Sequence, residues 1–213
     1  FKEKEKLHNF GKDLFKATNY LTPIVWESIN DVIVGAKEIM GFLKKVSRLV
    51  ASENLPVCWT TPKPLNFPVQ MMCYKKESKR VKTKMGDSII KLSIQSDTDE
   101  IDKRKTAQSI CPNLIHSLDA SCLMLAVIKA KDKGVTNFSL IHDSFGCVAP
   151  DVHKLSEAIR EAFCEVYEQD VLTNWAMEMK QMLSEKNAKK FPHIPERGNL
   201  DLSLVKQSIF FCV

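Results

Sequence analysis

The chain has 213 residues, of which 44% are hydrophobic, 27% charged and 8% aromatic, and its formal net charge is +5 at pH 7. This composition is typical of a globular protein with a sizeable core, and it excludes disordered and fibrous classes. The small positive charge permits nucleic-acid binding without requiring it. No apolar run reaches the roughly 18 residues that a membrane span needs, so we expect no membrane partner.

The cysteines and the first residues indicate the setting of the chain. The seven cysteines are odd in number, scattered, and never form C-x-x-C, which favours reduced thiols over disulfides or a zinc site. The chain starts at Phe1, without Met, inside a charged stretch. We therefore expect a fragment or a processed product, with residues 1–20 as a lead and 21–213 as the main region.

The first half predicts a long helix followed by strands. Thr22 and Pro23 form a favourable helix start, and apolar residues then recur at helical spacing to about Asn54. Short strands are expected at 57–61 and 69–74, on either side of a proline-rich connection.

A basic hairpin is expected next, within residues 69–95. Residues 75–84 hold six basic side chains and one acid, and apolar and polar residues then alternate to Gln95. Such a hairpin can be an ordinary solvated ribbon, or its cations can contact phosphates and groove edges of nucleic acid.

In the second half, Pro112 is expected to open a helix over 113–133, ending at Gly134. Strands at 138–141 and 145–149 then flank a turn, and helices follow at 152–167, 171–187 and 202–207. We expect the apolar end, 209–213, to be tucked in. The apolar stripe expected on the 113–133 helix is Ile115, Leu118, Cys122, Leu125 and Ile128, with Asn113, His116 and Ala120 on another face.

The residues His142 and Asp143 are the sharpest chemical feature. A carboxylate on a turn between strands is held at a sheet edge, where its oxygens can bind a hard cation such as Mg²⁺, and the neighbouring His can donate a hydrogen bond. A His-Asp pair in a turn can equally be structural or merely exposed.

The helix start around His116 is the second feature. Asn113 and His116 on a free helix face can donate to base edges in a minor groove. The competing interpretation is a core-facing His116 paired with Asp119, three residues further on.

The order and spacing of several motifs resemble the C-terminal part of the single-subunit, bacteriophage-type DNA-directed RNA polymerases, which include the mitochondrial enzymes. The match runs from about residue 20 to the end. The motifs that carry it are I-V-W-E-S-I at 24–29, V-C-W-T-T-P at 57–62, D-E-I-D-K-R-K at 99–105, P-N-L-I-H-S-L-D-A-S at 112–121, L-I-H-D-S-F-G at 140–146 and R-G-N-L-D-L at 197–202.

The resemblance implies roles for individual residues. Asp143 corresponds to the family's second metal-binding aspartate, which serves a two-Mg²⁺ nucleotidyl transfer, and His142 supports it. His116 corresponds to the residue against the minor groove near the primer end, with Asn113 a lesser candidate, and Lys105 to a basic residue just upstream.

The resemblance also implies a fold and partners. It predicts an α+β fold: palm and fingers elements of a right-hand polymerase, with a short antiparallel palm hairpin packed on long helices, and with C-terminal helices at 152–213. The implied partners are template and promoter DNA, nascent RNA, nucleoside triphosphates and the rest of the polymerase before Phe1. The implied location is a phage-infected or lysogenic bacterium or a mitochondrion. The basic hairpin resembles the promoter-specificity hairpin, and its expected DNA contacts are Arg80, Lys82, Lys84 and Lys91.

Some features depart from the family pattern. Thr106 stands where Gln is expected, Cys122 where many members have His, and Cys212 and Val213 follow the terminal aromatic pair. The first catalytic aspartate and the nucleotide-selecting fingers helix lie before the matched region. We therefore predict that this chain alone does not polymerise RNA.

Two other functions remain open. One is a metal-dependent phosphohydrolase built on His116, His142, Asp143 and a further acid such as Asp170, although the strand-like flanks of the His-Asp pair argue against it. The other is a non-catalytic polymerase remnant whose basic hairpin binds nucleic acid.

Overall fold

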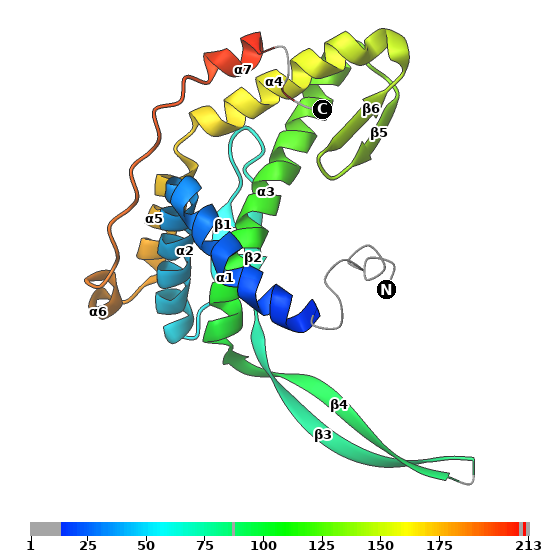
Figure 1. Ribbon diagram of the computed structural model, residues 1–213, viewed down its shortest axis with the longest axis vertical. Helices are drawn as coiled ribbons and strands as arrows, with labels where there is room; N and C mark the ends of the chain where they lie inside the picture. The colour runs from blue at the N-terminus through cyan, green and yellow to red at the C-terminus, as the bar shows by residue number, and fades with distance from the viewer. Residues whose placement is uncertain (1–13, 87, 209–210, 212–213) are drawn as a thin grey trace. The chain divides into compact units, whose positions relative to one another are not determined.

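The computed structural model describes residues 14–86, 88–208 and 211 (Figure 1). Of the expected lead over residues 1–20, residues 1–13 lie outside this range, and residues 14–20 are the start of a helix. The chain divides into two compact units, Phe1–Gly41 and Phe42–Val213. In the described ranges, helices are combined with three small antiparallel sheets of two strands each, so the fold class is α+β.

The predicted helix start at Thr22 is wrong. Helix α1 (Leu14–Val32) contains Pro23, and a break at Ile33 separates it from α2 (Val34–Ser52). A proline inside a helix removes one backbone hydrogen bond, which the rest of a 19-residue helix can tolerate. The Thr22 hydroxyl instead donates to the carbonyl of Thr18 at 2.7 Å, so it does not cap a helix start.

The second unit is organised around α3 (Lys103–Asp132), which begins ten residues before the predicted start at 113. Asp102 caps the helix by accepting hydrogen bonds from the backbone N–H groups of Arg104 and Lys105, both at 2.9 Å. Pro112, expected at the first turn, lies inside the helix. The lysine-rich stretch before Pro112 is therefore helical.

The buried face of α3 is rotated relative to the predicted stripe. Leu118 and Leu125 are buried as expected, but Ile115 and Ile128 are 48% and 47% exposed. Packing selects this face, because α4 (Val152–Glu168) lies along α3 and the two helices share a core. The buried members of this shared core are Leu125, Ala126, Ala130, Val135, Leu155, Ala158, Ile159, Ala162 and Val166.

Helix α3 also corrects the expectation about apolar runs. One 18-residue window of it has a mean hydropathy of 1.4, which by length and composition alone is sufficient for a membrane span. A core helix of a soluble protein meets the same criterion, and nine residues of α3 are buried in the protein. The observation is weak support for a span.

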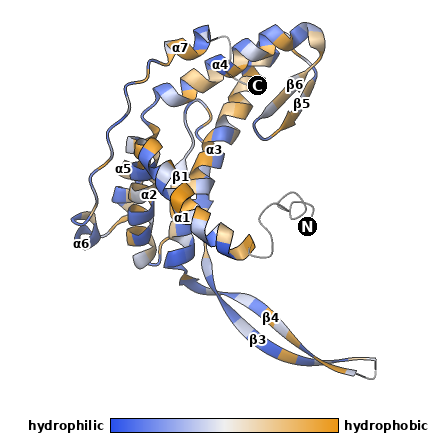
Figure 2. Ribbon diagram, in the orientation of Figure 1, coloured by the Kyte–Doolittle hydropathy of each residue, from blue (hydrophilic) through white to orange (hydrophobic). Residues whose placement is uncertain are grey.

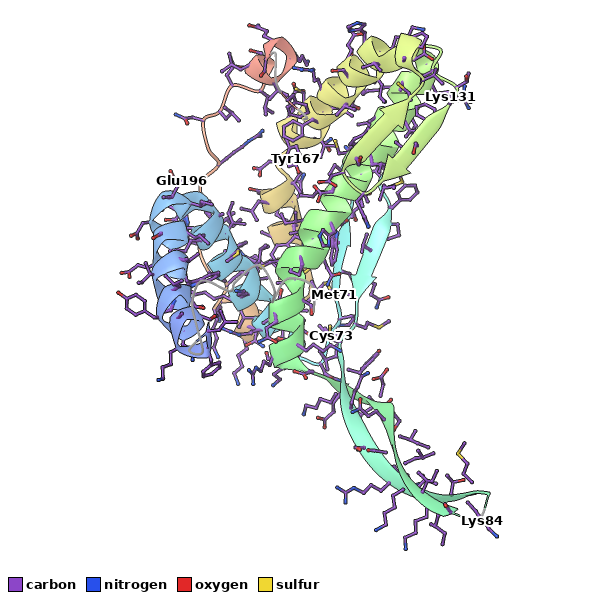
Figure 3. All side chains as sticks on the ribbon, turned by 45° about the vertical axis from the view of Figure 1, so that its right-hand side comes forward. Met71, Cys73, Lys84, Lys131, Tyr167 and Glu196 are labelled. Carbon is purple, nitrogen blue, oxygen red and sulfur yellow. The ribbon has the colours of Figure 1, made fainter. Side chains whose placement is uncertain are left out.

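The three sheets are hairpin-like pairs. β1 (Val57–Thr60) pairs with β2 (Pro68–Met71), β3 (Tyr74–Met85) with β4 (Ser88–Ile101), and β5 (Phe138–Ile141) with β6 (Ser144–Cys147). The basic hairpin therefore spans 74–101 and not 69–95, because residues 68–71 pair with β1. Figure 3 shows Met71 and Cys73 at the base of this hairpin and Lys84 near its tip.

The C-terminal part contains more breaks than predicted. A short 3₁₀ turn, η2 (Ala149–Asp151), precedes α4, and the predicted helix over 171–187 is split into α5 (Val171–Met182) and α6 (Glu185–Ala188). An extended segment then leads to α7 (Ser203–Gln207). Of the apolar end, Phe211 packs against the shared core of α3 and α4, as expected, whereas residues 209–210 and 212–213 lie outside the described range.

Long-range polar contacts hold α6 in place. The Glu53 carboxylate, at the end of α2, accepts hydrogen bonds from the backbone and hydroxyl of Ser184 at 3.0 and 2.5 Å, and from Asn187 at 2.6 Å. These bonds lower the pKa of Glu53, with the Ser184 hydroxyl the largest cause. A carboxylate at a helix N-terminus is also favoured by the helix dipole.

Candidate active site and nucleic-acid interface

The β5–β6 hairpin places His142 and Asp143 on a two-residue turn, as predicted. Ile141 pairs with Ser144, so these two residues are the whole connection between the strands. His142 has a φ of +53°, a left-handed conformation that is uncommon for residues other than glycine. Backbone strain of this kind is often found at functional sites, which makes the turn a candidate site.

Gly146 lets the two strands of this hairpin approach closely. A Cβ atom at this position would lie 3.2 Å from the carbonyl oxygen of Ser139, its cross-strand partner. Such a contact is tighter than an ordinary van der Waals contact, so a larger residue would push the strands apart. Because Gly146 lies close to the turn, this spacing bears on where Asp143 is held.

One face of α3 forms the opposite wall of a pocket of about 690 Å³ that contains the turn. The residues of α3 that line it follow helical spacing from His116. The pocket therefore brings together His116, His142 and Asp143, which are distant in the sequence. The complete lining is His116, Asp119, Ala120, Leu123, Met124, His142 and Asp143.

The interpretation of His116 as a core residue paired with Asp119 is wrong. Both side chains are exposed, and within the described part of the chain neither makes a hydrogen bond or ion pair. Asp119 was not expected as a site residue. Its position three residues after His116 is the sequence feature that indicates it, because residues three apart are neighbours on a helix surface. Behind it lies Tyr167 of α4, whose pKa is raised by burial and further by the Asp119 carboxylate.

The pocket offers oxygen ligands but not a complete metal site. Asp143 and Asp119 contribute carboxylates, the ligand type that Mg²⁺ prefers. Among residues 14–86, 88–208 and 211, however, no three His, Cys, Asp or Glu side chains lie close enough to hold an ion together. Asp143 and Asp119 are therefore ligands of the chemical type that a Mg²⁺ ion binds, but they are only part of the set of ligands that the ion needs.

The β3–β4 hairpin has one basic face and one face that is apolar toward the tip. Side chains alternate along a strand, and directly paired residues share a face, so all four expected contacts, Arg80, Lys82, Lys84 and Lys91, lie on the same side. Lys76 joins them there. The opposite side carries Val81, Ile90, Leu92 and Ile94, together with Glu77 and Lys79 nearer the base, and Figure 2 shows the resulting mixture of polar and apolar residues along both strands.

Lys82 and Lys91 face each other directly in this hairpin. Like charges in directly paired positions destabilise a two-stranded sheet, and within the described residues neither lysine has an acidic partner. Nearer the base, Lys75 does pair with Glu100 at 2.5 Å, which raises the pKa of Lys75 and lowers that of Glu100. The basic face is thus uncompensated toward the tip, which suits a polyanionic ligand.

A comparison with known protein families shows which family the chain belongs to. A model of the DNA-dependent RNA polymerase family matches residues 1–190. The chain belongs to this family. It is 37% identical to DNA-directed RNA polymerase 2, chloroplastic/mitochondrial, of Arabidopsis thaliana over 205 residues, which are 95% of this chain and 19% of that protein.

Phage members of the polymerase family are similarly related. The chain is 33% identical to T7 RNA polymerase of Escherichia phage T7 over 215 residues, and 34% identical to the DNA-directed RNA polymerase of Enterobacteria phage T3 over 211 residues. Each alignment covers 92% of this chain and 24% of the relative. The chain thus spans about a fifth to a quarter of the length of the relatives it matches.

Several of the expected site residues lie away from the pocket. Asn113 donates to the Ser109 carbonyl at 2.8 Å and contacts the Met71 sulfur at 3.3 Å, so its amide faces β2. Lys105 is exposed in the first turn of α3, and Asp170 caps α5 by accepting from the backbone of Thr173. Asp170 therefore does not join the proposed phosphohydrolase residues, and the acid that lines the pocket beside His116, His142 and Asp143 is Asp119.

The two internal departures from the family pattern lie in or beside the core. Thr106 is buried, and its hydroxyl has no hydrogen-bond partner among the described residues. Cys122 packs against the core shared by α3 and α4. Neither position belongs to the lining of the pocket.

Proposed function

We propose that this chain is the palm and fingers part, residues 21–213, of a single-subunit RNA polymerase that adds nucleotides from nucleoside triphosphates to the 3′ end of RNA on a DNA template. The observation that carries the proposal is the pocket in which His116 on α3 faces the His142–Asp143 turn. Family membership indicates the reaction class, and the pocket brings together the side chains that we propose take part in it.

Asp143 is proposed as a ligand of the catalytic Mg²⁺ ions. When bound, the ions activate the 3′-hydroxyl and stabilise the charge of the leaving pyrophosphate. Asp143 suits the role because its carboxylate is exposed to the pocket and, among described residues, has no cation that competes for it. The family's first catalytic aspartate would supply the other carboxylate of the metal site. We expect it in the region of the polymerase family that this chain does not match.

The two histidines are proposed to act on the nucleic acid and on the turn. His116 is exposed on the pocket wall, from which its imidazole can donate a hydrogen bond to a base edge of the nascent pair. His142 fixes the turn beside Asp143 and can donate to a phosphate oxygen. Asn113 and Lys105 are left as lesser contacts to nucleic acid, away from the pocket.

The basic face of the β3–β4 hairpin is proposed to bind promoter DNA. Two-stranded ribbons fit the major groove, and a row of cations on one face can follow the phosphates. Arg80, Lys82, Lys84 and Lys91 would make these contacts. The proposed location follows the relatives: a phage-infected bacterium or a mitochondrion.

Metal binding by the isolated chain tests the role of Asp143. Mn²⁺ can replace Mg²⁺ at oxygen sites, and its unpaired electrons broaden nearby NMR signals. We expect Mn²⁺ to broaden signals of His142 and His116 in the wild type and much less in Asp143→Asn. Asp132→Asn, an exposed aspartate at the far end of α3, is the matched control.

Equal broadening in wild type and Asp143→Asn would contradict the metal role. In a complete polymerase that contains these residues, Asp143→Asn should also abolish RNA synthesis while circular dichroism stays unchanged.

The rival function, a non-catalytic nucleic-acid-binding remnant, is favoured by the incomplete ligand set among the described residues. It predicts DNA binding that is independent of both Mg²⁺ and Asp143. The 213-residue chain alone is expected to make no RNA in either case, so metal binding and not synthesis distinguishes the two for the isolated chain.

A further inference from the structure

The C-terminal segment is fastened to α4 by two arginines that each bind the end of a helix. Arg160, on α4, donates from Nη1 to the carbonyl oxygens of Val205, at 2.8 Å, and of Ser208. These carbonyls lie at the C-terminal end of α7, where they have no partners within the helix. A guanidinium at this end is also favoured by the helix dipole.

Arg197, in the extended segment before α7, makes the reciprocal contact. It donates to the carbonyl oxygens of Glu168, at 3.0 Å, and of Tyr167, in the last turn of α4. Between the two arginines, the Cys164 thiol donates to the Leu202 carbonyl at 3.3 Å. The segment is therefore fixed to α4 at three places.

Beyond α7, Phe211 lies in an aromatic group on α4. Its ring centroid is 5.0 Å from that of Phe163, in an edge-to-face arrangement, and the Arg160 guanidinium is 5.6 Å from its centroid. Both geometries are favourable for an aromatic ring. Arg160 therefore touches Phe211 as well as the end of the helix that precedes it.

Phe211 shares its core with the β5–β6 hairpin. Phe138, Phe145 and Cys147 of the hairpin pack against the buried cluster shared by α3 and α4, and Phe211 packs against the same cluster. Phe145 is two residues from Asp143. The position of Phe211 and the position of the turn are thus constrained by one packed cluster, whose interior has little room to adjust.

We propose that Arg160 is a positioning residue that holds the His142–Asp143 turn in place by seating Phe211 against the core shared by α3 and α4. The inference rests on the proposed function, since the position of the turn matters for the reaction only if Asp143 binds metal. Arg160 itself lines no part of the pocket.

The chemistry of arginine suits this task. A planar guanidinium can bind two carbonyl oxygens and stack on a ring at once, which the compact ammonium of lysine cannot. Helix α7 has only five residues, and so short a helix is not stable by itself. Its end, and Phe211 after it, therefore depend on the anchor that Arg160 provides.

Hydrogen exchange of the β5 and β6 amides in the isolated chain tests the proposal. We expect Arg160→Ala to speed this exchange about tenfold, as loss of a charged hydrogen bond and of the packing behind it would do. Arg160→Lys should recover only part of the protection. Arg197→Ala is the matched variant: it removes an equal charge and another contact between α4 and the C-terminal segment but leaves the anchor next to Phe211, so hairpin exchange should stay near the wild-type rate.

A double-mutant cycle shows whether Arg160 acts through Phe211. In a Phe211→Ala background, Arg160→Ala should add little further exchange, because the ring it seats is already absent. Independent, additive effects would overturn the proposal, and so would equal exchange in Arg160→Ala and Arg197→Ala, because the arginine would then stabilise the segment in general.

Mn²⁺ broadening then connects the hairpin to the site. Arg160→Ala should raise the Mn²⁺ concentration that half-broadens the His142 signals, and Arg197→Ala should not. An unchanged Mn²⁺ concentration in Arg160→Ala would overturn the link to the site. If Mn²⁺ broadens nothing in the wild type, the proposed metal role fails, whereas the exchange cycle still decides whether Arg160 positions the hairpin.

Discussion

Removing the facing lysines of the β3–β4 hairpin is the most direct test of its proposed role in DNA binding. Lys82→Ala with Lys91→Ala deletes two of the five cations on the basic face. Because like charges in paired positions repel, their removal should stabilise the free hairpin slightly, by about 0.2–1 kcal/mol. Loss of DNA binding would therefore not result from unfolding.

The salt dependence of binding gives the expected size of the effect. The cations of the basic face are Lys76, Arg80, Lys82, Lys84 and Lys91. If each neutralises one phosphate, log K should fall with log salt with a slope of about −4.5, which is about a 500-fold loss of affinity between 50 and 200 mM salt. Without the facing lysines the slope should be about −2.7 and the loss about 40-fold.

Fluorescence anisotropy with a labelled duplex, measured over a salt series, provides both slopes. Lys189→Ala with Lys190→Ala is the matched control, since it removes the same charge from an exposed site after α6. We expect the control to keep the wild-type slope. A hairpin variant with the wild-type slope, or a control with the reduced one, would show that the basic face does not bind the phosphates.

Three further predictions concern stability. Glu53→Gln should remove a pH-dependent contribution to folding, because the pKa of Glu53 is lowered in the folded state. The stabilisation by Glu53 is present above about pH 4.3 and is lost as pH falls through the folded-state pKa. The difference in Tm between wild type and variant should therefore shrink in acid. A constant difference from pH 7 to pH 3 would refute this. Gly146→Ala should destabilise the chain by about 1–2 kcal/mol in urea unfolding, because the new methyl group crowds Ser139; an unchanged midpoint would mean that the strands adjust freely. His142→Gly should alter stability by less than about 1 kcal/mol, since relief of the left-handed φ offsets the entropy gained by the unfolded chain, and a loss well above that would show that the imidazole itself stabilises the fold.

The elements that the sequence predicted well depend on local patterns. Two short apolar strands around His142 and Asp143 leave only a tight turn between them, so the placement of this pair needed no tertiary information. By contrast, the common face of Arg80, Lys82, Lys84 and Lys91 was not predicted, because Lys91 joins the other three only through the register that pairs it with Lys82. The order of the motifs indicated the polymerase family, which the comparisons confirm.

The errors occur where packing overrides local preference. Pro23 and Pro112 are strong signals for a helix start, yet both lie inside helices. For Pro112 the cost of one lost hydrogen bond is offset by burial along the rest of the 30-residue helix. Local propensity also misplaced the buried face of α3, because the neighbour that covers it, α4, starts 20 residues after α3 ends.

What the sequence determined by itself was the chemistry available: a carboxylate and an imidazole on a turn, a second imidazole on a helix, and a row of cations on a ribbon. Only the tertiary structure decided which of these lie together. It brought His116 to the turn across a pocket, added Asp119, and directed the Asn113 amide toward β2. It also placed Phe211 against the core shared by α3 and α4, with the Arg160 guanidinium 5.6 Å from its ring centroid. These relations depend on how α3 and α4 pack, and packing is a property of distant residues that no local pattern encodes.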